Sequence, residues 1–175
     1  KLSIQLYVMI RPRGGDFLYS DLEFEMMKED IRFAKACRAD GVVLGILNAD
    51  GSVDVRRTRE LVELAAPLKV TFHRAIDMTR DMEEALEGII EAGCYRILTS
   101  GGRNTVNEGM ERIKALVKQA RGRVQIMAGS GVNAANASTL IKSGVDAIHL
   151  SGKSGRDSEM EFRNPNVFMG GVPGL

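Results

Sequence analysis

Two short segments of the chain carry side chains that could perform chemistry. Residues 11–16 read Arg-Pro-Arg-Gly-Gly-Asp, and residues 73–77 read His-Arg-Ala-Ile-Asp. An imidazole titrates near neutral pH, so His73 could act as a general acid or base, and Asp77 could orient it. We therefore predict His73 and Asp77 as catalytic residues. The alternative is that His73 is a hydrogen-bonded structural histidine.

The arginines of both segments predict a site for an anion. Guanidinium groups stay charged and bind carboxylates or phosphates through paired hydrogen bonds. We assign substrate binding to Arg11, Arg13, Asp16 and Arg74. In the alternative interpretation, Arg11 or Arg13 forms a structural ion pair with Asp16 or Asp77.

A glycine-rich turn predicts further ligand contacts. Gly129, Ser130 and Gly131 precede a helix that we expect to begin near Asn133. Backbone N–H groups at such a turn can bind phosphate. Ser100, in a Thr-Ser-Gly-Gly segment, is assigned to the same ligand. The alternative is a tight turn without a ligand, because glycine is the usual residue at strained turns.

Several other catalytic and metal-binding patterns are missing from the sequence. It contains no GxSxG elbow, no P-loop, no HExxH or HxH motif, and no lysine near the carboxyl end of a predicted strand. A Schiff-base aldolase is therefore not expected, and a metal site on His73 and His149 has no specific support. We assign no metal ligand, and we interpret Cys37 and Cys94 as packing residues.

The polar segments follow short apolar runs that predict strands. Six such runs begin at steps of mostly 23 to 28 residues, the length of one strand, one helix and two loops. Amphipathic stretches between them have helical spacing. The predicted strands are residues 4–11, 42–46, 69–73, 95–99, 123–128 and 146–150. The predicted helices begin near Ser20, Asp54, Asp81 and Met110, and a fifth runs from near Asn133 to Ser143.

This regular alternation predicts an α/β fold with a parallel sheet. We expect a (β/α)₈ TIM-barrel type domain with about six of its units in this chain, since a whole barrel needs about 200 to 250 residues. A doubly wound sheet is the competing architecture. The chain is expected to form one domain, residues 1–175, which is incomplete at the N-terminus and also at the glycine-rich C-terminus.

The loops after the strands of a parallel barrel open onto a single mouth. The fold therefore predicts one concave pocket that holds the polar side chains of both segments: Arg11, Arg13, Asp16, His73, Arg74 and Asp77. His73 should lie deepest, because it ends its strand.

Composition excludes several classes of partner. The 175 residues include 24 lysines and arginines against 23 aspartates and glutamates, whereas nucleic-acid binding needs a basic excess. The longest apolar stretches, residues 7–10 and 42–47, are far shorter than the roughly 20 residues that cross a bilayer. Two cysteines without CxxC spacing argue against a disulfide framework. We expect a cytoplasmic protein whose partner is a small anionic ligand, not nucleic acid or a membrane.

Four segments together resemble the CutC family, which is named for copper homeostasis. They are VMIRPRGGDFLYSDLEFEMMKEDI, VTFHRAIDM, RILTSGG and IMAGSGV, in this order within residues 7–168. The resemblance implies a (β/α)₈-type barrel, a cytoplasmic location, a homo-oligomer and copper as a cofactor. The cysteines proposed as Cu(I) ligands in that family belong to its first two strands, which this sequence lacks. No residue of this chain inherits that role.

Two functions therefore stand side by side. The resemblance implies copper-ion binding and intracellular copper homeostasis, and soft thiolate ligands would suit Cu(I). The polar segments favour a barrel enzyme that acts on an anionic small metabolite, phosphorylated or not, through His73 and the arginines.

Overall fold

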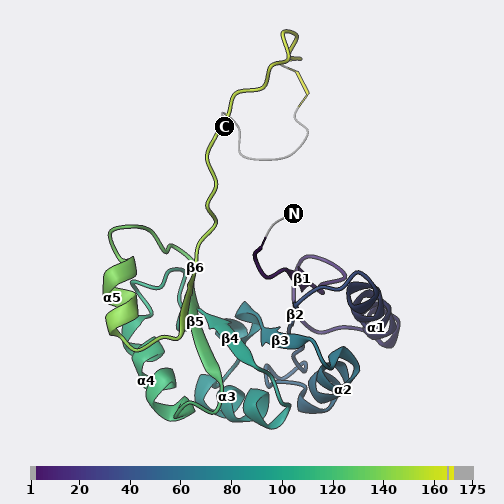
Figure 1. Cartoon of the computed structure of the whole chain (residues 1–175), viewed down its shortest axis with the longest axis vertical. Coiled ribbons are helices and arrows are strands. Elements are labelled where there is room, and N and C mark those ends of the chain that lie inside the picture. Colours follow the sequence, from purple (N-terminus) through teal and green to yellow (C-terminus); the bar gives the residue numbers. More distant parts are fainter. Residues whose placement is uncertain (1–2, 165, 168–175) are drawn as a thin grey trace.

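A parallel sheet of six strands forms the centre of the computed structural model, which describes residues 3–164 and 166–167. Each strand pairs with the next one along the chain (Figure 1). The strands are β1 (Tyr7–Met9), β2 (Gly41–Leu44), β3 (Lys69–Phe72), β4 (Arg96–Thr99), β5 (Gln125–Gly129) and β6 (Ala147–His149). Because the strand order never reverses, the structure confirms the predicted barrel-type sheet rather than a doubly wound one.

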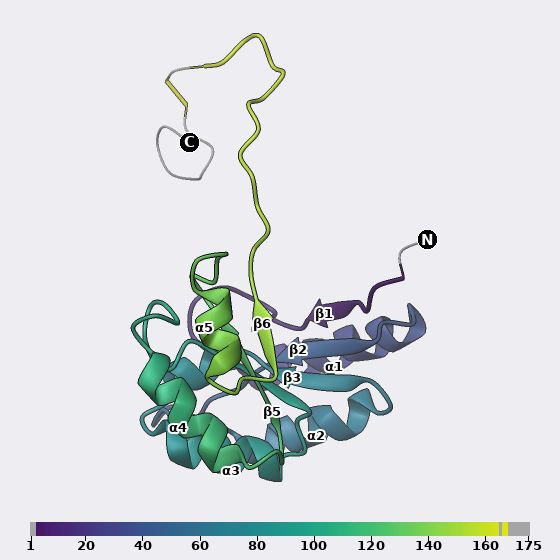
Figure 2. The ribbon, with the colours of Figure 1, turned by 60° about the vertical axis from the view of Figure 1, so that its left-hand side comes forward.

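Five α-helices of the described chain lie outside this sheet, as Figures 1 and 2 show. The helices are α1 (Asp21–Ala36), α2 (Val55–Ala65), α3 (Met82–Glu91), α4 (Met110–Ala120) and α5 (Ala137–Lys142). The start of α1 is fixed by a capping box, in which the Ser20 and Glu23 side chains each accept the other's backbone N–H. No helix in the described part of the chain is long and apolar enough to cross a bilayer.

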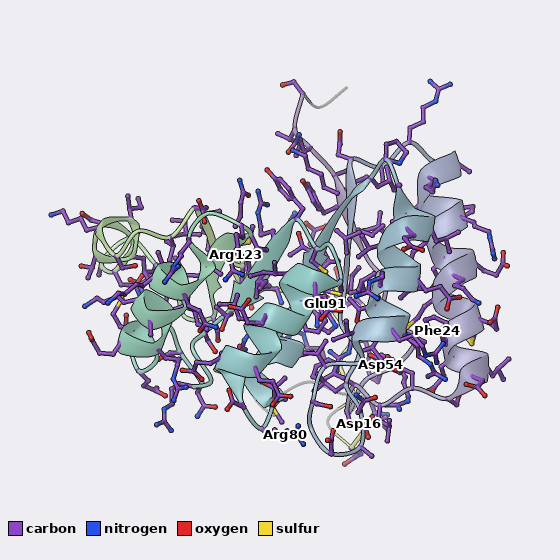
Figure 3. All side chains as sticks on the ribbon, turned by 90° about the horizontal axis from the view of Figure 1, so that it is seen from below. Asp16, Phe24, Asp54, Arg80, Glu91 and Arg123 are labelled. Atoms are coloured by element: carbon purple, nitrogen blue, oxygen red, sulfur yellow. The ribbon has the colours of Figure 1, made fainter. Side chains whose placement is uncertain are left out.

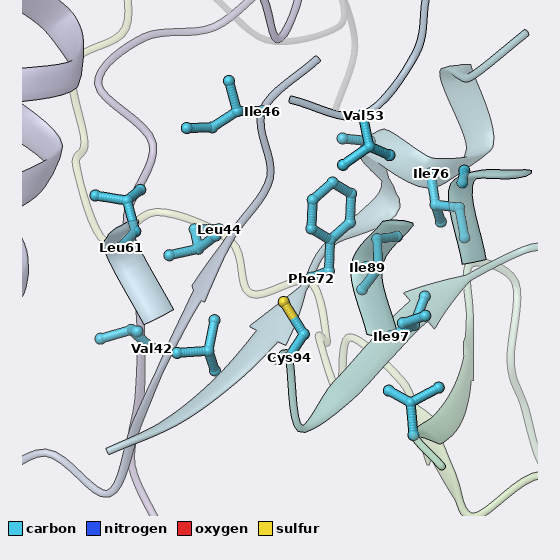
Figure 4. Close-up of a cluster of buried hydrophobic side chains, with 14 of the residues drawn as sticks. Val42, Leu44, Ile46, Val53, Leu61, Phe72, Ile76, Ile89, Cys94 and Ile97 are labelled. Carbon is cyan, nitrogen blue, oxygen red and sulfur yellow. The ribbon is translucent and has the colours of Figure 1, made fainter. Parts of the chain in front are cut away.

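The helices and the sheet enclose the hydrophobic core. Val42 and Val70 align across β2 and β3, and side chains on this face meet those of the helices (Figure 4). Phe72 of β3, Leu61 of α2 and Ile89 of α3 are fully buried there. Burial of each such side chain contributes roughly 1.5–3 kcal/mol, so the core holds the strand ends in fixed positions.

Charged side chains project from the outer surface of the molecule, among them Arg80, Glu91 and Arg123 (Figure 3). Arg123 pairs with Glu87 at 2.7 Å, and Arg80 pairs with Asp50 at 2.6 Å. Such exposed pairs contribute little to stability. Some cations of this surface are thus matched by nearby carboxylates, whereas others, such as Lys118 and Arg121, have no such partner among the described residues.

The segment after β3 and the segment before α5 differ from the simple alternation of strand and helix. Residues after β3 form a 3₁₀ helix, η1 (Arg74–Met78), with His73 as its N-cap. Helix α5 begins at Ala137, so the predicted start near Asn133 is wrong. Asn133 instead caps a separate turn ahead of the helix: its side-chain oxygen accepts the N–H groups of Ala135 and Asn136, and its carbonyl accepts the Ala137 N–H at 3.0 Å.

Candidate functional site

The carboxyl ends of the strands carry a dense hydrogen-bond network around Asp77. The Asp77 side chain is 4% exposed, and its carboxylate accepts Arg74 Nε–H at 2.7 Å. It also accepts the Thr99 hydroxyl at 2.5 Å and the backbone N–H groups of Ser100 and Gly102, each at 3.0 Å. With these donors around it, the Asp77 carboxylate has little capacity left to act as a base. Its effect is to join η1 to the loop after β4 and to hold Arg74 in place.

Arg74 is oriented by several groups at once. Besides Asp77, its Nη2 donates to the Ser100 hydroxyl at 2.7 Å and to the Arg103 carbonyl at 3.1 Å. The Arg74 side chain remains 40% exposed. A guanidinium held in this way presents a fixed positive charge at the mouth of the sheet, and little conformational entropy is left to lose when an anion binds.

His73 lies at the end of β3 and is only 4% exposed. Its Nδ1 accepts the Ala75 backbone N–H at 3.2 Å, so the ring proton sits on Nε2. Nε2 is buried and has no hydrogen-bond partner among the described residues. Burial lowers the pKa of His73 from 6.5 to about 4, and the positive charge of Arg11 adds to this effect. The imidazole is therefore neutral at neutral pH and presents an unpaired donor.

The predicted contact between His73 and Asp77 is not made. Among the described residues, none of the hydrogen bonds of Asp77 goes to His73. The physical reason is the η1 turn: His73 caps its start through Nδ1, while Asp77, one turn later, faces the loop after β4. Asp77 therefore positions Arg74 rather than the imidazole.

Gly45, just after β2, makes room for the imidazole. A Cβ atom at this position would lie 2.5 Å from His73 Nδ1 and 2.6 Å from its Cε1. Only glycine leaves that space free without moving the ring. The sequence offered no direct signal for this contact, because the two residues belong to different strands.

Arg11 and Phe17 cover His73 on the side of the loop after β1. The Phe17 ring centroid lies 4.9 Å from that of His73, and the Arg11 guanidinium lies 4.8 Å above the Phe17 ring. Arg11 also donates to the Gly15 carbonyl at 2.8 Å. Among the described residues, no carboxylate pairs with Arg11. Its charge is therefore available to a ligand.

Arg13, unlike Arg11, binds carboxylates of its own loop and of α1. It forms ion pairs with Glu23 at 2.5 Å and with Asp16 at 3.0 Å, and it donates to the Leu18 carbonyl at 2.7 Å. The Ser20 N–H and the Arg13 guanidinium lower the pKa of the Glu23 carboxyl. These contacts match the structural ion pair weighed above for this segment, and they tie the loop to the start of α1.

A cavity of about 770 Å³, here called the rim cavity, opens between the loops after β1, β2 and β3. Its lining brings together Arg11, Asp16, Arg74 and Asp77, whereas Arg13 and His73 are not part of it. The remaining lining residues include Phe17, Leu18, Leu47, Asn48 and Met78, none of which was predicted. The turn Asn48-Ala49-Asp50-Gly51, in the loop after β2, is the sequence signal that could have indicated Asn48.

A second cavity of about 550 Å³, here called the turn cavity, lies beside the loops after β5 and β6. It is lined by the predicted residues Ser130 and Gly131, and also by Arg74, Asn133, His149 and Lys153. Gly129 lies just behind this turn, where a Cβ would come within 2.6 Å of the Leu98 side chain. Ser100 does not line either cavity and acts through Arg74.

A third cavity, of about 630 Å³, differs from the other two in the charges of its lining residues. Two of its cations, Arg80 and Arg112, are already paired with Asp50 and Glu83. Acidic residues also outnumber the arginines in its lining, whereas the rim cavity has as many arginines as aspartates, so this cavity offers an anion a poorer binding site than the rim cavity.

The histidines, cysteines and carboxylates of the described residues do not gather into a metal site. No three histidine, cysteine, aspartate or glutamate residues of residues 3–164 and 166–167 group as metal ligands. Cys94 is buried, and burial raises the pKa of its thiol to about 12, which disfavours the thiolate that binds a metal. Cys37 is exposed at the end of α1. Both cysteines precede strands, at the end of the sheet opposite the two cavities.

Comparison with known proteins gives a consistent result. The model of the CutC family matches residues 1–154. The chain is 49% identical to a mouse protein named copper homeostasis protein cutC homolog, over 97% of this chain and 62% of the relative. It is 51% identical to a Vibrio cholerae protein named as a CutC family member, over 95% of this chain and 67% of that protein. The chain therefore spans less than two thirds of the length of the mouse relative.

Solved structures agree with the fold. A crystal structure from Streptococcus agalactiae, whose protein is named CutC, superposes with a TM-score of 0.79 at 38% identity, covering 83% of this chain and 72% of the other. An aldolase named QR15 superposes with a TM-score of 0.69 at 21% identity, covering 85% of this chain and 68% of the other, which speaks for the fold alone. With a family model over most of its length and relatives near half identity, the chain belongs to the CutC family.

Proposed function

We propose that this chain binds a small anionic metabolite in the rim cavity. The observation that supports it best is the guanidinium of Arg11, which lines the cavity and has no carboxylate partner among the described residues. Arg74 lines the same cavity. A carboxylate or phosphate between the two cations would gain charge-assisted hydrogen bonds.

The state of His73 limits the chemistry that this site could perform. With Nδ1 occupied and a pKa of about 4, the imidazole is a donor and not a base at neutral pH. A ligand oxygen that reached Nε2 would accept a hydrogen bond from its N–H group and would be polarised by it. In this proposal His73 polarises a bound carbonyl or carboxylate, and Asp77 is a positioning residue for Arg74.

Copper homeostasis, a term that appears in the names of relatives, is the second candidate function. Family membership supports that role, while the donor atoms of the described residues do not form a Cu(I) site. In our proposal, any Cu(I) bound by the whole protein takes its thiolate ligands from outside the described residues. The anion site and copper binding are then separate properties.

We also propose a cytoplasmic location and self-association. The net charge of +1 and the two unpaired cysteines are compatible with a reducing compartment. Within the described residues, β1 and β6 each pair on one side only, and open strand edges favour association with further chain.

Titration with acetate at constant ionic strength tests the anion site. In ¹H–¹⁵N NMR spectra, we expect the Arg11 Nε–H and the Phe17 amide signals to shift with the anion concentration. The Arg11→Ala variant should bind acetate at least tenfold more weakly, since a lost charge-assisted bond costs about 1.5–3 kcal/mol.

A matched variant separates this effect from general charge. Lys118 is an exposed cation of α4 that lines neither cavity, so Lys118→Ala should leave acetate binding unchanged. Equal losses in Arg11→Ala and Lys118→Ala would mean that anions merely gather around a cationic surface. The proposed function would then be wrong.

A further inference from the structure

The turn after β5 lines the turn cavity and contains backbone N–H groups without an acceptor among the described residues. Ser130 and Gly131 have positive φ values of 85° and 74°, and the Ser130 hydroxyl fixes the turn by donating to the Asn104 carbonyl at 2.6 Å. In the described part of the chain, no group accepts the backbone N–H groups of Ser130, Gly131 and Val132. Successive free N–H groups around a left-handed residue form a concave site for anions.

The charges that line the turn cavity have one sign. Arg74 and Lys153 line it, and no aspartate or glutamate is among its lining residues. Lys153 has no ion-pair partner among the described residues. Asn133 and His149 add polar side chains. Three free N–H groups and two cations suit a phosphate group, which has several acceptor oxygens and up to two negative charges. Asp77, the carboxylate that pairs with Arg74, does not line this cavity.

Arg74 connects the two cavities, since it lines both of them. Its position is fixed by the bonds to Asp77, Ser100 and Arg103 described above. A guanidinium has five N–H donors in a rigid fork, and Arg74 uses only some of them in these bonds. A single ligand can therefore contact Arg74 in its middle and extend into a cavity on each side.

We propose that the rim cavity and the turn cavity are the two ends of one site, and that its ligand is an acyclic phosphorylated carboxylic acid. The phosphate group lies against the Ser130–Val132 N–H groups. The carboxylate lies at Arg11, where Leu18, Leu47 and Met78 provide an apolar wall for the carbon chain. This inference rests on the proposed function, because its carboxylate end is the anion site at Arg11.

Three probes separate the two ends: inorganic phosphate, glycerate and 3-phosphoglycerate. We expect phosphate to shift the amide signals of residues 130–132, and glycerate to shift those of Arg11 and Phe17. The linked probe, 3-phosphoglycerate, should shift both sets and bind at least about 100-fold more tightly than either fragment, since the second contact becomes intramolecular.

Variants at each end test the linkage. Arg11→Ala should reduce the affinity for 3-phosphoglycerate to that for phosphate and leave phosphate binding unchanged. Lys153→Ala should weaken the binding of phosphate and of 3-phosphoglycerate, and it should leave the binding of glycerate unchanged. Lys118→Ala, the matched control, should change none of the three.

The possible failures are distinguishable. If 3-phosphoglycerate binds no more tightly than phosphate, the two cavities are independent, and this inference is wrong while the anion site at Arg11 can stand. If phosphate leaves the amide signals of residues 130–132 unmoved, the turn is not an anion site and the inference is again wrong. If glycerate leaves Arg11 and Phe17 unmoved while phosphate shifts residues 130–132, the proposed function itself fails.

Discussion

Acidification should destabilise the protein through the buried imidazole of His73. In the unfolded chain His73 takes up a proton below its ordinary pKa of 6.5, whereas in the folded protein it does so only below about 4. Between these two values the unfolded state binds one more proton, so the free energy of unfolding falls as the pH falls. The difference in pKa corresponds to about 3 kcal/mol of stability. This stability is fully present above pH 6.5 and is lost by about pH 4.

Urea unfolding at a series of pH values measures this contribution. The comparison is between the unaltered protein and His73→Gln, which keeps a polar side chain but cannot titrate. We expect the unaltered protein to lose about 3 kcal/mol more than the variant between about pH 6.5 and pH 4. His149→Gln is the matched control, since His149 is the other histidine and lies exposed at the end of β6.

NMR gives an independent readout of the same group. The Cε1 proton of His73 should titrate with an apparent pKa near 4, and the ring ¹⁵N shifts should show the proton on Nε2. Parallel pH dependences in the unaltered protein and in His73→Gln would refute the reasoning. They would mean that the ring is hydrated in the folded state and that Nε2 is not an unpaired donor.

The remaining predictions concern the Asp77 network and the thiols. Asp77→Ala should lower the free energy of unfolding by about 3–5 kcal/mol, because it leaves the buried donors of Thr99 and Ser100 without an acceptor. A loss below about 1 kcal/mol in urea unfolding would contradict the network. In the native protein an aromatic disulfide reagent should modify the exposed Cys37 rapidly and Cys94 only after unfolding; equal rates would show that Cys94 is accessible. In a reducing Cu(I) titration, a Cys37→Ser, Cys94→Ser variant should bind as much copper as the unaltered chain; a loss of stoichiometric binding would identify one of these thiols as a ligand.

Strand positions and the gathering of polar segments at one end could be predicted from the sequence, because both follow from local patterns. The apolar runs of two-residue period mark strands, and parallel strands bring the loops behind them to one rim. The same patterns do not separate α5 from the turn ahead of it, which Asn133 caps through both its side-chain oxygen and its carbonyl.

The partners of each site residue could not be predicted in the same way. Arg11 and Arg13 are the same residue type two positions apart, but among the described residues only Arg13 has carboxylate partners. This difference depends on where the folded loop places Glu23. Proximity in sequence predicts that Asp77 binds His73, whereas its donors are Arg74 and a loop more than 20 residues further on. Such contacts depend on tertiary structure, which a single sequence does not encode in any short pattern.

The contact between Gly45 and His73 has a consequence for sequence variation among relatives. An alanine at position 45 would place its methyl group within 2.6 Å of the ring, so selection cannot change that residue alone while a histidine remains at position 73. Relatives with a side chain at position 45 should carry a smaller residue than histidine at position 73. Those that keep both residues should share the same buried donor, whatever loops surround it. The identity of position 45 therefore becomes a marker, readable in any alignment, for the members of the family that retain this imidazole.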